Sequence, residues 1–119
     1  MSDAVDAASN TIAVTISNNT IEANTTTKAA MFTISVTNGT ILGPNGKYIG
    51  SNSDANGMTI SESALTNTIT LNGSDVDIIA AGGAYLRYNS TSGQTRFRYY
   101  KSTSYTGQKA IQLYKYTDN

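Results

Sequence analysis

The stretch NGKYIGSNSDANGMTIS, residues 45–61, returns without a gap as GGAYLRYNSTSGQTRFR, residues 82–98. In both copies a glycine precedes an aromatic-aliphatic pair, and a polar loop then leads into an alternating segment. The two stretches start 37 residues apart, and this spacing aligns Tyr48 with Tyr85, Ile49 with Leu86, Asn52 with Asn89, and Ile60 with Phe97. A sequence pattern that recurs without gaps predicts two copies of a single structural unit.

Alternation with a period of two continues on both sides of the repeat. Ile12, Val14 and Ile16 alternate with small or polar residues, which is the pattern of a half-buried strand. Further strand patterns precede the copies at Phe32–Val36 and Thr68–Leu71. The Asn-Gly pair at residues 38–39 predicts a tight hairpin, and residues 61–66 predict a connecting turn, because that segment is too short for a stable helix.

Short strands at this spacing predict an all-β fold. We expect a small antiparallel barrel or sandwich with an internal two-fold repeat of hairpin units. A β-trefoil-like arrangement is the alternative, with the N-terminal third as a degenerate copy. The predicted core consists of Phe32, Ile34, Ile41, Ile49, Ile60, Ile78, Leu86, Phe97, Ile111 and Leu113.

The length of 119 residues predicts one domain. Residues 1–10 are small and polar and are expected to be a flexible lead-in or linker, with a single β domain over residues 11–119. Within it, the copies cover about residues 32–61 and 68–98, and a closing strand covers residues 110–117.

Composition excludes several kinds of chemistry. The chain has no cysteine and no histidine, which removes thiolate nucleophiles, disulfides, zinc fingers and imidazole-based triads. We therefore predict a protein that is not an enzyme and that has no cofactor and no metal site. No apolar run reaches the roughly 20 residues of a membrane span, so none is expected, and residues 1–10 lack the pattern of a signal peptide.

Charge is divided unevenly along the chain. Residues 1–79 contain two basic and seven acidic residues, a net charge of −5, whereas residues 80–119 contain six basic residues and one acidic residue, a net charge of +5. The total is zero, which argues against a nucleic-acid partner, because non-specific binding to phosphates depends on a net positive surface.

Three separated pieces of the second half carry a resemblance. GAYLRYNS, TRFRYYKS and IQLYKY resemble a YL-x-YNS, RF-x-x-Y, I-x-LYK pattern of C-terminal β-rich modules in secreted or surface multidomain proteins of gut bacteria. The resemblance covers roughly residues 30–117. It implies an accessory module attached to hydrolases, nucleases or adhesins, with an extracellular or cell-surface location, and it transfers no catalytic residue.

Seven of the eight tyrosines follow residue 80. Aromatic rings beside planar polar groups suit sugars, because the rings pack on pyranose C–H faces while the polar groups bond hydroxyls. Alternation places Arg96, Arg98 and Tyr100 on one face of their strand, opposite Phe97 and Tyr99. The predicted ligand-binding residues are Arg87, Tyr88, Arg96, Arg98, Tyr100, Tyr114 and Tyr116. Ordinary strand packing is the competing interpretation for most of these tyrosines.

Two acidic patterns have simpler interpretations than catalysis or calcium binding. Asn52, Asp54 and Asn56 are spaced like the start of a calcium loop, but Ser63 occupies the position that needs glutamate, so a polar hairpin loop is expected. Asp75 and Asp77 share one face of a strand, and we interpret them as charges that solvate a sheet edge.

These observations predict a non-catalytic binding module of an exported bacterial protein, with weak carbohydrate binding through the exposed tyrosines and arginines of the second copy. The alternative is a structural or adhesive spacer that docks to neighbouring domains or self-associates. The expected partner is accordingly a glycan or a neighbouring protein domain.

Overall fold

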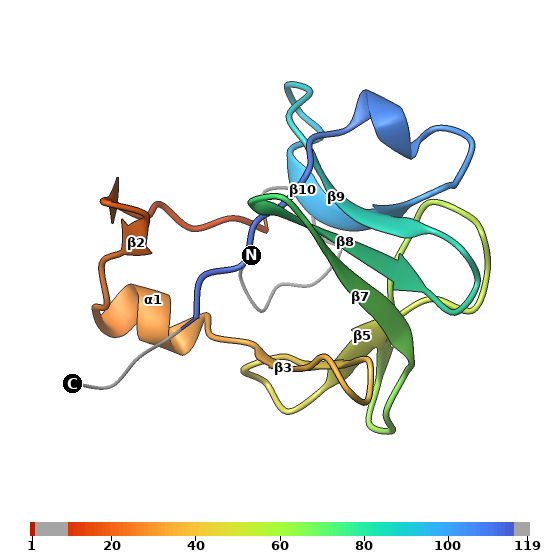
Figure 1. The fold of residues 1–119 in the computed structure, drawn as a ribbon, viewed down its shortest axis with the longest axis horizontal. Coiled ribbons are helices and arrows are strands. Elements are labelled where there is room, and N and C mark those ends of the chain that lie inside the picture. The colour runs from red at the N-terminus through yellow and green to blue at the C-terminus, as the bar shows by residue number, and fades with distance from the viewer. Residues whose placement is uncertain (2–9, 116–119) are drawn as a thin grey trace.

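The computed structural model describes Met1 and residues 10–115, and Figure 1 shows a small β protein with one short α-helix. The elements are β1 (Ile16–Ser17), β2 (Thr20–Ile21), α1 (Thr25–Ala29), β3 (Thr33–Ser35), β4 (Thr40–Leu42), β5 (Tyr48–Gly50), β6 (Thr59–Ser61), β7 (Asn67–Asn72), β8 (Asp75–Ala80), β9 (Tyr85–Asn89), β10 (Arg96–Tyr100) and the 3-10 helix η1 (Tyr105–Gly107). Among the described residues, the helices are too short or too polar to cross a membrane.

The two sequence copies form two four-stranded antiparallel sheets. The order is β3-β4-β5-β6 in the first sheet and β7-β8-β9-β10 in the second, so both are meanders in which strands that follow each other in sequence are paired. Corresponding strands keep the sequence spacing, since β5 begins at Tyr48 and β9 begins at Tyr85. The predicted all-β antiparallel fold with an internal repeat is therefore confirmed.

The arrangement is sandwich-like. Over the described residues, none of the sheets closes into a barrel. The two four-stranded sheets instead contribute to one hydrophobic core, which contains Ile41 and Ile49 of the first and Ile78 and Leu86 of the second. Together these sheets bury the apolar face that neither could cover alone.

Most of the predicted core is buried. Ile41, Ile49, Ile78, Leu86 and Ile111 are all at most 8% exposed. Phe32, Ile34 and Phe97 are partly buried against them. The other members of the core cluster are Val76, Ala80, Ala84 and Tyr99. Alternation placed Tyr99 on the same face as Phe97, whereas the other three residues were not predicted as core.

Two core predictions are wrong. Ile60 is 46% exposed and Leu113 is 43% exposed. Ile60 lies on β6, an edge strand of the first sheet, so a strand neighbour covers it on one side only. Leu113 follows Ile111, the last residue that bridges to a sheet, and the described chain beyond that point has left the core.

The N-terminal third differs from the expected strands. The strand predicted from residue 11 shortens to β1, which pairs with β2 around Asn18 and Asn19, both in the left-handed region. Asn24 then caps α1 by accepting from the Thr27 backbone, and the Thr27 hydroxyl accepts from the Asn24 backbone. In Figure 1 this hairpin and α1 lie beside the sheets. Residues 10–30 therefore do not form a third four-stranded copy, and the trefoil alternative is not found in the described chain.

In both four-stranded sheets, the two central strands are paired at one position only and separate beyond it. β4 and β5 have the single registered pair Leu42 and Tyr48, and β8 and β9 have the matching pair Ile79 and Tyr85. Beyond these pairs the strands diverge, so their backbone groups need other partners.

Later parts of the chain bond to the backbone that this divergence exposes. In the first copy, the Ser51 carbonyl accepts from the Gly82 N–H at 3.0 Å. At the equivalent position of the second copy, Tyr88 exchanges two backbone bonds with Lys109, of 2.8 and 3.0 Å. In its described part, residues 110–115, the closing strand expected over residues 110–117 forms one isolated bridge, at Ile111, and a second bridge lies just before it at Lys109. This part of the chain contacts β8 and β9 at one residue each because it lies in the gap between them. Residues 116–117 of this prediction lie outside the described residues.

One buried polar contact joins the two copies. The Tyr99 hydroxyl donates to Asn67 Oδ1 at 2.5 Å, and the Asn67 amide donates to the carbonyls of Gly39 and Ile49 at 3.1 and 3.3 Å. Tyr99 is fully buried and Asn67 is 3% exposed. Burial raises the pKa of the Tyr99 hydroxyl, which therefore stays protonated and able to donate. The backbone of Tyr99 also pairs with Gly57 of the first copy.

We expect Tyr99→Phe to lower the free energy of unfolding by about 1–3 kcal/mol, because it leaves the buried Asn67 oxygen without its donor. Denaturant unfolding followed by circular dichroism measures the change. Tyr48→Phe is the control, since it removes the same hydroxyl from a ring that is only half-buried. Equal stability of Tyr99→Phe and the wild type would contradict the structural role of this contact.

The docking of the copies also requires a glycine at position 82. A Cβ atom there would lie 2.3 Å from the Ser53 nitrogen, a backbone atom of the first copy. Gly82→Ala should lower the free energy of unfolding by about 1–3 kcal/mol through this overlap. Gly107→Ala, where a Cβ meets no atom within 4 Å, should change it by less than about 0.5 kcal/mol. Similar melting temperatures for the two variants would show that the copies are not packed this closely.

Candidate functional site

The outer face of β9 and β10 carries the arginines of the second copy. The register pairs Arg98 with Arg87 and Arg96 with Asn89, and directly opposed residues of antiparallel strands point to the same side. Phe97 is on the opposite, core-facing side. We refer to Arg87, Asn89, Arg96 and Arg98 as the arginine face. The prediction that Arg96 and Arg98 share a face is confirmed.

Arg87 is fixed in place at the base of this face. Its guanidinium donates to Asp77 Oδ1 at 2.6 Å, and the side chains of Arg87 and Asp77 are 12% and 23% exposed. The guanidinium carbon also lies 5.0 Å from the centre of the Tyr105 ring, and Tyr105 stacks on Tyr85 with ring centres 3.8 Å apart. This packing holds the guanidinium and neutralises much of its charge.

The Nε atom of Arg87 is buried and has no hydrogen-bond partner within the described residues. Asp77 has a second contact, from the Asn72 amide at 3.5 Å. Arg87 therefore has a structural role within the arginine face. A ligand would contact Arg96, Arg98 and Asn89, each of which is only partly buried.

Arg96 and Arg98 extend this face along β10. The Arg96 guanidinium donates to Gln94 Oε1 at 3.0 Å, which adds an amide to the polar groups at this end of the strand. Guanidinium and amide groups are planar and can form paired hydrogen bonds with hydroxyls or carboxylates. The surface thus offers several directed donors on rigid strands.

The first sheet shows a related pair of strands without these side chains. The residues that align in sequence with Arg87, Arg96 and Arg98 are Gly50, Thr59 and Ser61, which lie on β5 and β6. Gly50 pairs with Thr59 whereas Arg87 pairs with Arg98, so the pairing differs by two residues, and a shift of two keeps each side chain on the same side of its strand. Asp77 aligns with Thr40 on β4. One pair of equivalent surfaces is therefore small and uncharged, and the other carries three guanidinium groups and a carboxylate.

Three other predicted site residues are not part of the arginine face. Tyr100 is on the same side of β10, opposite Tyr85 in the register, but it is only 4% exposed. The expectation of an exposed Tyr100 is therefore wrong. Tyr88 faces the core, with its ring centre 4.9 Å from that of Phe97.

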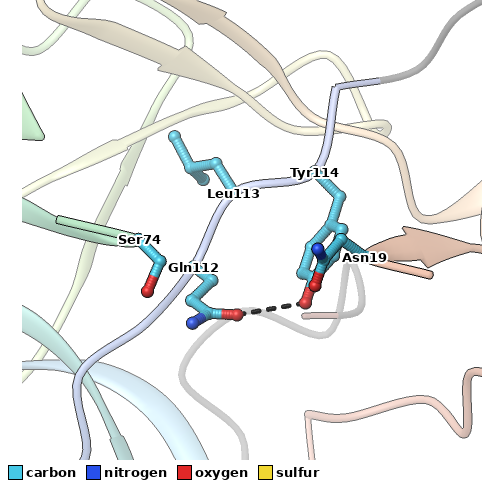
Figure 2. Close-up of a pocket in the computed structure, with 5 residues that line it drawn as sticks. All are labelled: Asn19, Ser74, Gln112, Leu113 and Tyr114. Atoms are coloured by element: carbon cyan, nitrogen blue, oxygen red, sulfur yellow. Dashed lines mark hydrogen bonds between the residues drawn. The ribbon is translucent and has the colours of Figure 1, made fainter. Parts of the chain in front are cut away.

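Tyr114 belongs to a different location. Figure 2 shows it with Asn19, Ser74, Gln112 and Leu113 around a small pocket of about 270 Å³. Its hydroxyl donates to Gln112 Oε1 at 3.0 Å, and the Gln112 amide donates to Asp75 at 3.2 Å. The structure therefore does not bring Tyr114 together with the arginines. Tyr116 lies outside the described residues.

Sequence reasoning did not select Tyr85, Tyr105 or Asp77, which surround Arg87. Alternation along residues 85–89 places Tyr85 and Arg87 on the same side of the strand, so the sequence could have predicted that Tyr85 lies near Arg87. No sequence pattern predicted the position of Tyr105, because it lies in the 3-10 helix η1 and only the fold of residues 101–107 places it on Tyr85.

The two acidic patterns are structural. Asp54 accepts from the Ser102 backbone at 2.7 Å and from its hydroxyl, and Asn56 accepts from the Lys101 backbone at 2.9 Å, so the polar loop caps the chain after β10. Within the described part of the chain, no three histidine, cysteine or acidic side chains are grouped as metal ligands. Asp75 and Asp77 lie on β8, an inner strand, and so the interpretation that they solvate a sheet edge is wrong.

Comparisons with protein-family models, with curated proteins and with solved structures found no match to this chain.

The bonds from Ser102 to Asp54 hold the pKa of that carboxyl below its ordinary value. A carboxyl whose pKa is lower in the folded state stabilises the fold above its unfolded pKa, and this stabilisation disappears as the pH falls through the folded pKa. We therefore expect Asp54→Asn to lower the melting temperature at pH 7, and the difference from wild type to shrink below about pH 4. Melting curves across this range, with Glu22→Gln as a control for net charge, measure the effect. A difference that stays constant with pH would contradict this role of Asp54.

Proposed function

We propose that the protein is a non-catalytic module that binds carbohydrate on the arginine face. The observation that carries the proposal is the contrast between the two copies at matched positions. Thr59 and Ser61 complete the first sheet where the second has Arg96 and Arg98, so the repeated strands can form without guanidinium groups at these positions. Two long cationic side chains at these positions are best explained by a ligand.

The chemistry of the face suits a sugar. Sugar hydroxyls need directed planar partners, and Arg96, Arg98, Asn89 and Gln94 offer guanidinium and amide groups on or beside two paired strands. The arginines lie on one face of a sheet and are half-buried, which favours contact with one side of a saccharide over full enclosure. Weak binding follows from the small area that such a contact covers.

The resemblance to accessory modules of exported bacterial proteins points the same way. Its first two pieces, residues 83–90 and 95–102, include β9 and β10, and these are the strands that carry the arginine face. Leu86 and Tyr99 of these pieces belong to the core. We therefore propose an extracellular or cell-surface location, with the module serving a larger protein by holding it near a glycan.

The test compares wild type with the double variant Arg96→Thr/Arg98→Ser, which installs the side chains that the first copy has at the same positions. A glycan array identifies a ligand and calorimetry measures its affinity. We expect the double variant to bind at least about tenfold more weakly, because hydrogen bonds to charged groups contribute about 1.5–3 kcal/mol each. Its unfolding curve is measured alongside, so that a loss of binding can be distinguished from a loss of folding.

The matched control is Lys109→Ser/Lys115→Ser, which removes the same charge from exposed residues away from this face. It should bind the glycan as wild type does. Absence of any glycan ligand, or equal loss in both double variants, would refute the proposal. Sedimentation at low and high salt examines the structural alternative, which predicts self-association that salt abolishes, since the two halves of the chain carry opposite net charges.

A further inference from the structure

A second surface with ligand-binding character lies on the other side of the second sheet. A cavity with a volume of about 1040 Å³ is bordered by the N-terminal hairpin, α1, the core and residues 109–115. Its apolar wall reaches into the core at Ile41, Ile78 and Leu86. We refer to it as the apolar cavity. Its volume is at the upper end of the roughly 300–1,000 Å³ that is typical of small-molecule sites.

The apolar cavity is open to solvent and exposes hydrophobic side chains to it. Val14, Ile16, Met31 and Leu113 line it, and they are 39–54% exposed. They make up four of the seven large exposed hydrophobic residues found in the described chain. Apolar surface gathered in a concave site is a mark of a binding site, because its contact with water is unfavourable.

The charged residues of the lining are mainly basic. Lys28, Lys109 and Lys115 line the cavity, and Glu22 is the one acidic residue among its described lining. Lys109 and Lys115 are both exposed, and they flank the segment that contributes Ala110, Ile111 and Leu113 to the apolar wall. An apolar interior with ammonium groups at exposed positions is complementary to a ligand that has a long apolar part and an anionic head.

We propose that the apolar cavity binds a single-chain amphiphile with an anionic head, of which a long-chain fatty acid is the simplest example. The acyl chain lies against Ile78, Leu86 and the exposed apolar residues of the lining. The carboxylate lies at the opening beside Lys109 and Lys115. This site is separate from the arginine face, because Leu86 and Phe97 point to the opposite side of β9 and β10 from Arg87 and Arg98.

The experiment measures the affinity of wild type for decanoate and dodecanoate, below the concentrations at which they form micelles, by calorimetry. Burial of a methylene group increases affinity about fourfold, so two additional methylenes should give about fifteenfold tighter binding. Dodecylammonium has the same chain and the opposite head charge, and it should bind at least about tenfold more weakly than dodecanoate. Equal affinity for the two heads, or no dependence on chain length, would overturn the proposal.

Two variants with matched controls test the location. Val14→Asp places a charge on the cavity wall and should weaken dodecanoate binding at least tenfold, whereas Leu71→Asp, at an exposed residue outside the lining, should leave it unchanged. Lys109→Ser/Lys115→Ser should weaken dodecanoate binding but not dodecanol binding. Arg96→Thr/Arg98→Ser should change neither, which separates this site from the glycan proposal.

Methyl NMR on wild type keeps the test independent of any variant's folding. Dodecanoate should shift the methyl signals of Ile41 and Ile78, which line the apolar cavity, and should leave Ile49 unchanged, since it is equally buried but does not line it. Shifts confined to Leu71 or Val36, at exposed positions elsewhere, would place the ligand outside the cavity and overturn the proposal.

Discussion

The hydrogen bond between the Tyr99 hydroxyl and Asn67 is the contact on which the two-sheet structure depends. Asn67 begins β7 and also bonds to carbonyls of the first sheet, while the backbone of Tyr99 pairs with Gly57. Both residues are buried, so a misplaced partner would leave a polar group without a bond in the core. The contact therefore fixes how the sheets meet, and the hydrophobic side chains can pack in one arrangement.

Once the sheets are fixed in this way, their outer and inner surfaces can differ without changing the fold. The copies keep the same strand order, and two core residues of the first, Ile41 and Ile49, align with Ile78 and Leu86 of the second. On the outside, small hydroxyl side chains of β6 are replaced by arginines on β10. Side chains on the solvent side of a strand contribute little to which fold forms, since packing on the core side sets the register. This freedom allows one copy to support the fold while the other carries the proposed binding surface.

The basic residues of the second half are divided between two environments that suit their chemistry. Arginines lie on β9 and β10, where the rigid strands hold planar groups in fixed directions, as recognition of hydroxyls or carboxylates requires. Lysines lie at the exposed positions 109 and 115 beside the apolar cavity, where a flexible stem can follow an apolar wall while the ammonium group stays in water. Five of the six basic residues of the stretch 80–119 thus belong to two proposed sites of different specificity.

The sequence by itself determined the strands of the repeat, their equivalence and the faces of Arg96, Arg98, Ile78 and Leu86, because a strand alternates sides with a period of two whatever surrounds it. It did not determine the burial of Tyr100, because alternation places this residue on the outer face, whereas in the folded chain it is only 4% exposed. Nor could it separate Tyr114 from the arginines or bring Asp77 to Arg87. These outcomes depend on contacts between strands and on chain segments that follow no regular period, and only packing of the whole chain decides such contacts.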